Sequence, residues 1–430
     1  MIIQSSSNRR AAIWRCAQPR SVSPQGILDF STLPNLLPSD KLSLKVPRRA
    51  FRPVGLGLAI SLLLLLTACG GGGEEANPFE VKSELVTEAS FPVAMAFTPD
   101  GRLFYAEQYT GNVRVITPEG QLLPEPFAHV DAEAQFDWGV TGLAIDPDFE
   151  SSHYVYVAFM EPAGEGTARP VVTRFTDDDN RGVDPARIVE NLQETDPEHK
   201  FFNATGNIRF GPDGFLYMAI GDYDLADFAQ DLTASAGKIL RVNREDGSAP
   251  SDNPFVDEEG ADPRVFAYGF RKPFGFAFHP ETDKLYAPDN GPVTCDELNI
   301  VEAGKNYGWP MTFESRYADC EANQVTEPIY FFAHEGTRPV DHLSVVRPRG
   351  IAFASASHYP LLGDSLIVCE EFSNFMRRLV FGGANNEVVE DDVVVRDCQL
   401  DVAISPDGII YYSNFSEIRR LAPIPESAAG

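Results

Sequence analysis

The seven histidines of this chain are the first candidates for acid–base or metal chemistry. None is arranged as His-x-His or His-Glu-x-x-His, the spacings that direct two imidazoles at one zinc ion. The chain also has no Gly-x-Ser-x-Gly sequence, which would form the turn that exposes a hydrolase serine. We therefore expect neither a zinc site nor a serine nucleophile.

The thiol of Cys69 is a second candidate for chemistry, because it follows Leu-Thr-Ala at the end of an apolar run that begins at Val54. The run has about 13 residues, fewer than the roughly 20 of a spanning helix, and three arginines precede it, as in a signal peptide. Leu-Thr-Ala-Cys resembles the lipobox of bacterial lipoproteins, which implies cleavage and acylation at Cys69. The alternative is an ordinary signal peptide with Cys69 incidental. Residues 1–47 before it are unusual for a leader and suggest a start codon assigned too early.

Export leaves four further cysteines to pair in an oxidising compartment. They are Cys295, Cys320, Cys369 and Cys398. Four cysteines allow three connectivities. We favour pairing of sequence neighbours, Cys295 with Cys320 and Cys369 with Cys398, because each bond would close a loop of modest length. The chain has no Cys-x-x-Cys, so dithiol redox chemistry and a zinc knuckle are not expected.

The chain is strongly acidic, with 35 Lys and Arg against 63 Asp and Glu and a formal net charge of −28. Removal of a leader rich in arginine makes the remainder more acidic still. Such a field repels phosphate backbones and favours cations, so nucleic acid is not an expected partner.

A repeated phrase determines the elements that must position any site. Three clear copies of apolar-x-Pro-Asp-Gly-x-apolar-aromatic begin at Phe97, Phe210 and Ile404, and weaker copies begin at Ile145, Phe278 and Ile351. Pro-Asp-Gly is a turn, because proline presets φ and glycine accepts a positive φ. Each copy therefore predicts one β-hairpin.

Six hairpins at intervals of about 50 to 70 residues, each with room for a second strand pair, predict an all-β fold, a six-bladed β-propeller. A β-sandwich is the alternative, and an α/β barrel fits poorly because long helical periodicity is absent. We expect a leader at 1–68, a lipidated cysteine and flexible linker at 69–80 and the propeller domain at 81–425.

Several phrases resemble the glucose/sorbosone dehydrogenase family, and the resemblance covers about residues 85 to 422. They are Gly-Phe-Arg-Lys-Pro-Phe-Gly-Phe-Ala-Phe-His-Pro from Gly269, Asp-Asn-Gly-Pro from Asp289, Asp-Glu-Leu-Asn from Asp296 and Gly-Lys-Asn-Tyr-Gly-Trp-Pro from Gly304. The resemblance implies a six-bladed propeller related to aldose sugar dehydrogenases that use pyrroloquinoline quinone and calcium.

The resemblance also implies a histidine base ahead of the third repeat, and that position is Asn203. An amide cannot serve as a general base near neutral pH. His199, four residues upstream, is the substitute if the loop is remodelled.

The quinone is a tricarboxylate, and the resemblance places Arg271, Lys272 and Asp137 in its pocket. Arg271 keeps the family cation, whereas Lys272 replaces an asparagine and Asp137 replaces a glutamine. Phe372 and Leu400 occupy positions where the family has a lysine and an arginine. Carboxylates desolvated without these cations would lose several kcal/mol of binding free energy.

For calcium, the resemblance implies ligands from the backbone carbonyls of Gly291 and Pro292. Asp296 and Glu297 could add hard oxygen ligands or brace the loop. The alternative is a solvent-facing acidic turn held by a disulfide at Cys295.

Two functions follow. The favoured one is an exported, lipid-anchored, non-catalytic propeller on the periplasm-facing outer membrane, which binds a saccharide or a protein partner. The other is an active quinone-dependent sugar dehydrogenase that oxidises an aldose in the periplasm. A calcium-centred lactonase-like hydrolase is a weaker third interpretation, because the inward carboxylates it needs are not evident.

Overall fold

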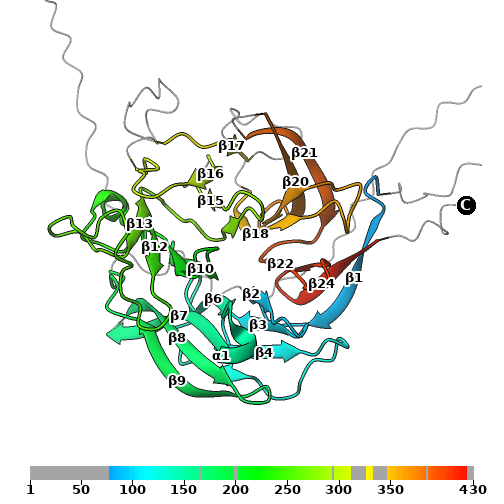
Figure 1. Ribbon diagram of the computed structural model, residues 1–430, viewed down its shortest axis with the longest axis horizontal. Helices are drawn as coiled ribbons and strands as arrows, with labels where there is room; N and C mark the ends of the chain where they lie inside the picture. Colours follow the sequence, from blue (N-terminus) through cyan, green and yellow to red (C-terminus); the bar gives the residue numbers. More distant parts are fainter. Residues whose placement is uncertain are drawn as a thin grey trace, which may run out of the picture. The chain divides into compact units, whose positions relative to one another are not determined.

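The structure is a computed structural model that describes residues 77–164, 166–196, 202–292, 295–310, 326–332, 346–383 and 386–423. These residues form six four-stranded antiparallel sheets. The sheets follow one another around a common centre, and the first strand of each lies innermost (Figure 1). The expected all-β, six-bladed propeller is therefore confirmed.

Each of the first three blades is formed from four consecutive strands. They are β2 (Pro92–Phe97), β3 (Leu103–Glu107), β4 (Asn112–Ile116) and β5 (Ala128–His129), then β6 (Val140–Ile145), β7 (Tyr154–Gly164), β8 (Thr167–Asp177) and β9 (Gly182–Val189), then β10 (Thr205–Phe210), β11 (Leu216–Ile220), β12 (Lys238–Val242) and β13 (Val265–Tyr268). A short helix, α1 (Phe149–Ser152), and a 3₁₀ turn, η1 (Ala226–Gln230), lie in their connections.

The fourth and fifth blades repeat this order, and the sixth takes one strand from the other end of the domain. They contain β14 (Ala277–Phe278), β15 (Leu285–Asp289), β16 (Glu297–Val301) and β17 (Tyr330–Phe331), then β18 (Pro348–Ala354), β19 (Ser365–Glu370), β20 (Phe375–Gly382) and β21 (Glu387–Arg396), then β22 (Val402–Ile404), β23 (Ile410–Ser413), β24 (Glu417–Pro423) and β1 (Val81–Glu88).

The Pro-Asp-Gly phrases form the turns between the first and second strands of three blades. Gly101, Gly214 and Gly408 have φ values of 88°, 79° and 81°. Their backbone N–H groups donate to the carbonyls three residues earlier over 2.8–2.9 Å. The positive φ is the conformation for which glycine is required in such a turn.

The aromatic residue that ends the first strand in four blades packs against a tyrosine of the preceding blade. Ring centroids lie 5.0–5.3 Å apart and the rings meet nearly edge to face in the pairs Phe97–Tyr411, Phe210–Tyr156, Phe278–Tyr217 and Phe353–Tyr286. This geometry is favourable beyond the area that it buries. The aromatic residues that open three of the repeat phrases, Phe97, Phe210 and Phe278, are thus contacts between blades.

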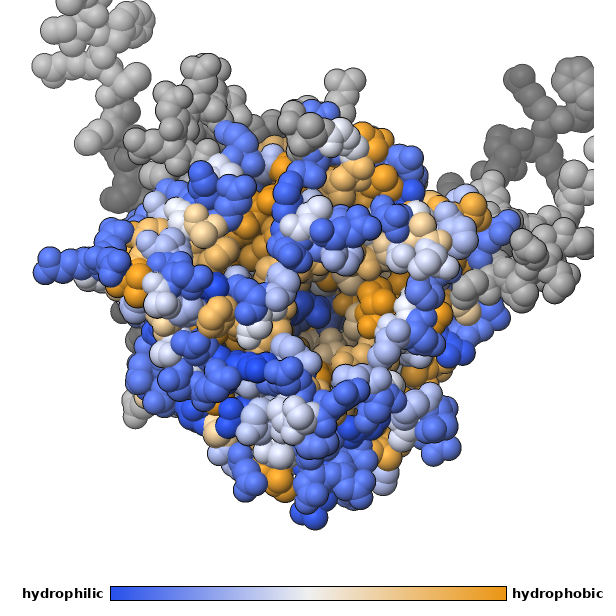
Figure 2. Space-filling model, in the orientation of Figure 1, coloured by the Kyte–Doolittle hydropathy of each residue, from blue (hydrophilic) through white to orange (hydrophobic). Residues whose placement is uncertain are grey.

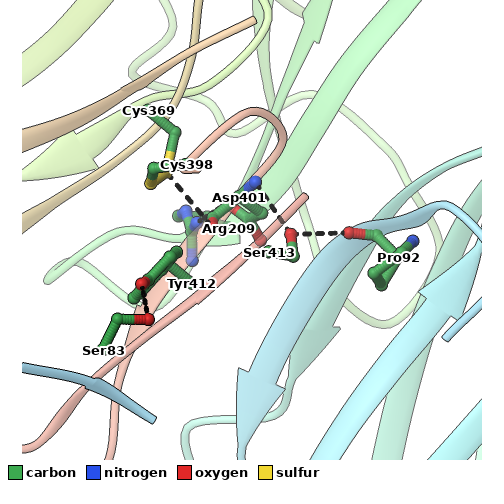
Figure 3. The surroundings of a disulfide bond; sticks show 8 residues. All are labelled: Ser83, Pro92, Arg209, Cys369, Cys398, Asp401, Tyr412 and Ser413. Carbon is green, nitrogen blue, oxygen red and sulfur yellow. Dashed lines mark hydrogen bonds and ion pairs between the residues drawn. A yellow bond between two sulfur atoms is a disulfide. The ribbon is translucent and has the colours of Figure 1, made fainter. Parts of the chain in front are cut away.

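The ring is closed by β1, which pairs with β24 so that Val81 lies opposite Pro423 and Glu88 opposite Glu417. A disulfide between Cys369 and Cys398, with Cα atoms 4.9 Å apart, links β19 to the segment that enters the sixth blade (Figure 3). This is the pairing favoured from the sequence. Cys320 and Cys69 lie outside the described residues.

The carboxyl ends of the six first strands surround a cavity of about 440 Å³, lined by apolar side chains and Arg209. Figure 2 shows one face of the molecule, hollowed near the centre of the ring with hydrophobic side chains along part of the hollow. Among the described residues, no helix has the length and apolar character needed to cross a membrane.

Candidate functional site

The amino ends of the first strands lie on the face opposite that cavity, and most of the family-implied residues are found there. Asp137 precedes β6, Asn203 precedes β10 and Lys272 precedes β14. Because each first strand begins on this face, loops from successive blades meet around the axis of the ring, and we call the region around Asp137, Asn203 and Lys272 the funnel.

A buried ion pair lies in the funnel. The Nζ atom of Lys272 is 2.6 Å from Oδ2 of Asp137, and the two side chains are 3 % and 14 % exposed. Burial raises the pKa of Asp137, but the positive charges of Lys272 and Arg349 outweigh it and lower the pKa to about 2. Asp137 is therefore ionised at neutral pH, and it neutralises the lysine.

Asn203 is buried and fixed on both sides. Its backbone N–H donates to Oδ2 of Asp137 over 3.0 Å, and its side-chain amide donates to Oδ1 of Asp222 over 2.8 Å. The other oxygen of Asp222 accepts from the indole N–H of Trp309 over 2.8 Å. Burial raises the pKa of Asp222. This network holds an amide, with no titratable proton, in the position where the family was expected to have its base.

Two arginines of the fifth blade share one carboxylate. Nε and Nη2 of Arg349 both lie 2.6 Å from Oε2 of Glu371, and Nη1 of Arg347 lies 3.7 Å from Oε1. Arg349 stacks on Phe274, and Arg347 stacks on Phe372 with 4.3 Å from each guanidinium carbon to the ring centroid. Glu371 therefore offsets one of these two positive charges, and the pair of arginines keeps a net charge of +1.

The Gly291 loop uses its polar groups internally. Nη1 of Arg271 donates to the carbonyls of Asn290 and Gly291, each over 3.0 Å. Asp296 is fully buried, and its two oxygens accept backbone N–H bonds from Gly291, Val346 and Arg347 over 2.7–2.9 Å. Asp296 therefore braces the loop.

Glu297 lies in β16 opposite Asp289 of β15. Its Oε1 accepts from the side-chain amide of Asn299 over 3.1 Å. Burial, together with the charge of Glu297, raises the pKa of Asp289 to about 8. Across the described part of the chain, no group of three or more His, Cys, Asp or Glu is arranged to hold a metal ion.

The structure unites some of the predicted residues and separates others. Asp137, Asn203 and Lys272 are in direct contact, and the Arg271 carbonyl accepts from the N–H of Asp222 over 2.9 Å. Phe372 lies on the same face, whereas the Leu400 side chain is buried. Pro292 and Cys295 are described in the same loop, but His199 lies outside the described residues.

Sequence reasoning did not identify Asp222, Trp309, Arg349 or Glu371 as site residues. Two signals were available. Arg-Pro-Arg at 347–349 places two cations at the start of a first strand, and Gly-Asp at 221–222 follows β11 where a second strand ends. Glu371 had no local signal, because its role depends on contacts with those arginines.

Comparison with known proteins agrees with the motif resemblance. The family model described as Glucose / Sorbosone dehydrogenase matches residues 89–419. Aldose sugar dehydrogenase YliI of Escherichia coli K12 is 28 % identical over 367 residues, covering 82 % of this chain and 94 % of the relative. Mouse Hedgehog-interacting protein is 27 % identical over 252 residues, covering 52 % of this chain and 34 % of the relative.

Solved structures give the same result. A putative oxidoreductase (glucose dehydrogenase) from Thermus thermophilus matches with a TM-score of 0.68 and 29 % identity, over 80 % of this chain and 100 % of that one. The apo form of the soluble aldose sugar dehydrogenase from Escherichia coli matches with a TM-score of 0.68 and 25 % identity, over 80 % of this chain and 99 % of that one. Because the family model covers most of the propeller, this chain belongs to the glucose/sorbosone dehydrogenase family.

Proposed function

We propose that this chain is a non-catalytic, saccharide-binding member of its family, and that its funnel does not hold the quinone. The observation that carries the proposal is the buried Asp137–Lys272 ion pair, joined by hydrogen bonds to Asn203. The chain supplies its own carboxylate as the partner of Lys272, so this cation is already paired.

Charge balance supports this proposal. A tricarboxylate requires cations without other partners. Lys272 is paired with Asp137, Arg347 and Arg349 share Glu371, and Arg271 donates to two backbone carbonyls, so two carboxylates offset two of these four positive charges. Releasing a cation from a buried pair costs about 3–5 kcal/mol, because a charge is left uncompensated. The two remaining positive charges do not balance three carboxylates, so the residues present do not fit the quinone.

The funnel also offers no evident base for sugar oxidation among its described residues. Asn203 cannot accept a proton near neutral pH. Both oxygens of Asp222, the carboxylate next to it, already accept hydrogen bonds. Each of these hydrogen bonds stabilises the ionised carboxylate and so weakens it as a base.

Calcium is not part of the proposal. The Gly291 carbonyl accepts from a guanidinium, and the oxygens of Asp296 accept backbone N–H groups. A calcium ion would have to displace these donors. We expect neither calcium nor a chelator to change the melting temperature, and a calcium-dependent increase would restore the metal site as a hypothesis.

A neutral polyhydroxy ligand fits the funnel better than an anion. Carboxylate oxygens keep acceptor capacity for the hydroxyls of a ligand, and a neutral ligand leaves no charge unpaired. The names of several relatives refer to sugar dehydrogenases, which supports a sugar ligand, whereas the Hedgehog-interacting relatives make a protein the other partner to test. We also propose export and lipid anchoring at Cys69 on the periplasm-facing outer membrane, on the sequence pattern described above.

The proposal is tested by mixing the purified protein with pyrroloquinoline quinone and calcium and recording the absorbance spectrum, followed by dye reduction with glucose. We expect the spectrum of free quinone, no dye reduction, and heat of glucose binding by calorimetry. A bound-quinone spectrum with dye reduction would instead establish an active quinone-dependent sugar dehydrogenase. Acylation is tested by mass spectrometry of the N-terminal peptide, and an unmodified Cys69 in the exported form would contradict it.

A further inference from the structure

Aromatic side chains are exposed around the funnel. The face that carries Asp137 and Asn203 exposes Tyr109 (42 %), Phe136 (61 %), Phe202 (48 %), Phe372 (54 %) and Phe415 (39 %). The other large hydrophobic side chains exposed in the described part of the chain are aliphatic, Leu85, Leu361 and Val389. Soluble proteins rarely gather exposed apolar surface in one place without a binding function.

Five rings form a continuous series that we call the aromatic arc, which is Phe415, Phe91, Tyr109, Phe136 and Phe202. Phe91 stacks on Phe415 with centroids 4.9 Å apart and lies 4.8 Å from the ring of Tyr109. The hydroxyl of Tyr109 donates to the carbonyl of Phe136 over 2.7 Å, and the Phe136 ring lies 5.6 Å from Phe202. The arc therefore crosses four consecutive blades, from the sixth through the first and second to the third.

Two members of the arc have a strained backbone. Phe91 and Phe136 have φ values of 50° and 49°, in the left-handed region that bulky residues rarely adopt. Such strain persists where the surrounding structure enforces it, and it concentrates at binding sites. Two hydrogen bonds hold these conformations. The backbone N–H of Phe91 donates to the carbonyl of Phe415, and the side-chain amide of Gln108 donates to the carbonyl of Phe136. Although its backbone is strained, Phe136 has the most exposed ring of the five.

We propose that the aromatic arc stacks on successive sugar rings of an oligosaccharide, one unit of which enters the funnel above the Asp137–Lys272 pair. This inference rests on the proposed function and extends it from a single sugar to a chain. A sugar ring has an apolar C–H face and a polar hydroxyl edge. The negative faces of the arc's rings attract the C–H groups, and the funnel's polar groups meet the hydroxyls.

The size of the arc favours this ligand over a protein. An aromatic side chain offers about 150–250 Å², and the arc's rings are on average less than half exposed, so together they present roughly 400 Å². A stable protein interface covers about 800 Å² on each partner. The area of the arc is too small for a stable protein interface, but it suits a few consecutive sugar rings.

Calorimetric titration tests the inference. The affinity for glucose is compared with the affinities for cellotriose and maltotriose, and the affinity for N-acetylglucosamine with that for chitotriose. We expect at least one trisaccharide to bind about tenfold tighter than its monosaccharide, since each stacked ring adds favourable contact. Phe136→Ala and Phe202→Ala should remove this gain and change monosaccharide affinity less than about twofold. Phe202→Trp should retain the gain, and Leu361→Ala, which removes an equally exposed side chain elsewhere, should have no effect.

The outcomes separate the two proposals. If the monosaccharides bind but the trisaccharides bind no tighter, or if the arc variants keep the full gain, the aromatic arc is not a sugar-binding surface and the funnel proposal stands. If none of the five sugars binds, both proposals are overturned, and capture of a protein partner becomes the alternative to test on the same variants.

Discussion

The side chains of Asp137 and Lys272 form a single ion pair. In the sequence they lie 135 residues apart, at two positions where the family resemblance leads us to expect amides. In the structure each explains the other, because a buried lysine in place of an amide needs a counter-ion and a carboxylate in place of an amide needs a cation. No local pattern could have linked them, since the contact depends on the order of blades around the ring.

Breaking this pair should be costly. We expect Lys272→Met to lower the free energy of unfolding by about 3–5 kcal/mol, because the charge of Asp137 is left buried and unpaired. Adding Asp137→Asn should recover part of the loss, since an amide can still accept from the Asn203 N–H. Urea denaturation gives both values.

The exposed pair Lys82–Glu84, 2.7 Å apart, provides a matched control. Lys82→Met should change the stability by less than about 1 kcal/mol, because solvent screens an exposed pair. A loss of under about 1 kcal/mol in Lys272→Met as well would contradict a charged buried pair.

Asp401 predicts a pH dependence. Burial raises its pKa to about 6, although the charge of Arg209 opposes the shift. An unfolded aspartate titrates near pH 3.9, so between about pH 4 and 6 the folded protein keeps a proton that the unfolded chain has released. Stability from this group is therefore present below pH 4 and is lost as the pH rises through 6.

We expect Asp401→Asn to gain roughly 2 kcal/mol relative to the wild type between pH 4 and pH 7, because the variant lacks the titration. Urea denaturation across this pH range gives the difference. Asp131→Asn, at a fully exposed position, serves as the control for the removal of one carboxylate. A constant difference for Asp401→Asn would contradict the titration.

At the scale of elements, the sequence predicted the hairpins well because each depends on local chemistry. Gly101, Gly214 and Gly408 have the positive φ that their turns require. The expectation that Asp296 could ligate calcium had no such local basis. Whether its oxygens face a metal or backbone N–H groups depends on Val346 and Arg347, which lie 50 and 51 residues further along the chain.

The Cys369–Cys398 disulfide joins two blades across 29 residues of sequence. Closing a loop of this length restricts the unfolded chain and contributes about 3–4 kcal/mol in the chain-entropy model. We expect Cys369→Ala with Cys398→Ala to lower the free energy of unfolding by this amount in guanidinium titrations. Equal midpoints for the variant and the oxidised wild type would show that the bond does not stabilise the fold.

For the whole molecule, repeat counting was sufficient to predict the ring of six blades but not its site. The aromatic arc takes its rings from four blades, and the two arginines of the fifth blade meet Glu371 through a hairpin loop. The arginines and Glu371 meet within one blade, whereas the rings of the arc become neighbours only when the blades are arranged around a common centre. The funnel is therefore a property of the closed ring.

The closing strand β1 also determines on which face the chain enters the propeller. At its far end Glu88 pairs with Glu417, close to Phe415 on the funnel face, so Val81 enters the ring on the opposite face. The segment from Cys69 to Val81 can extend at most about 40 Å. With the proposed lipid on Cys69, the propeller would be tethered to the membrane through the face opposite the funnel. The funnel and the aromatic arc would then be free to face away from the membrane, toward soluble ligands.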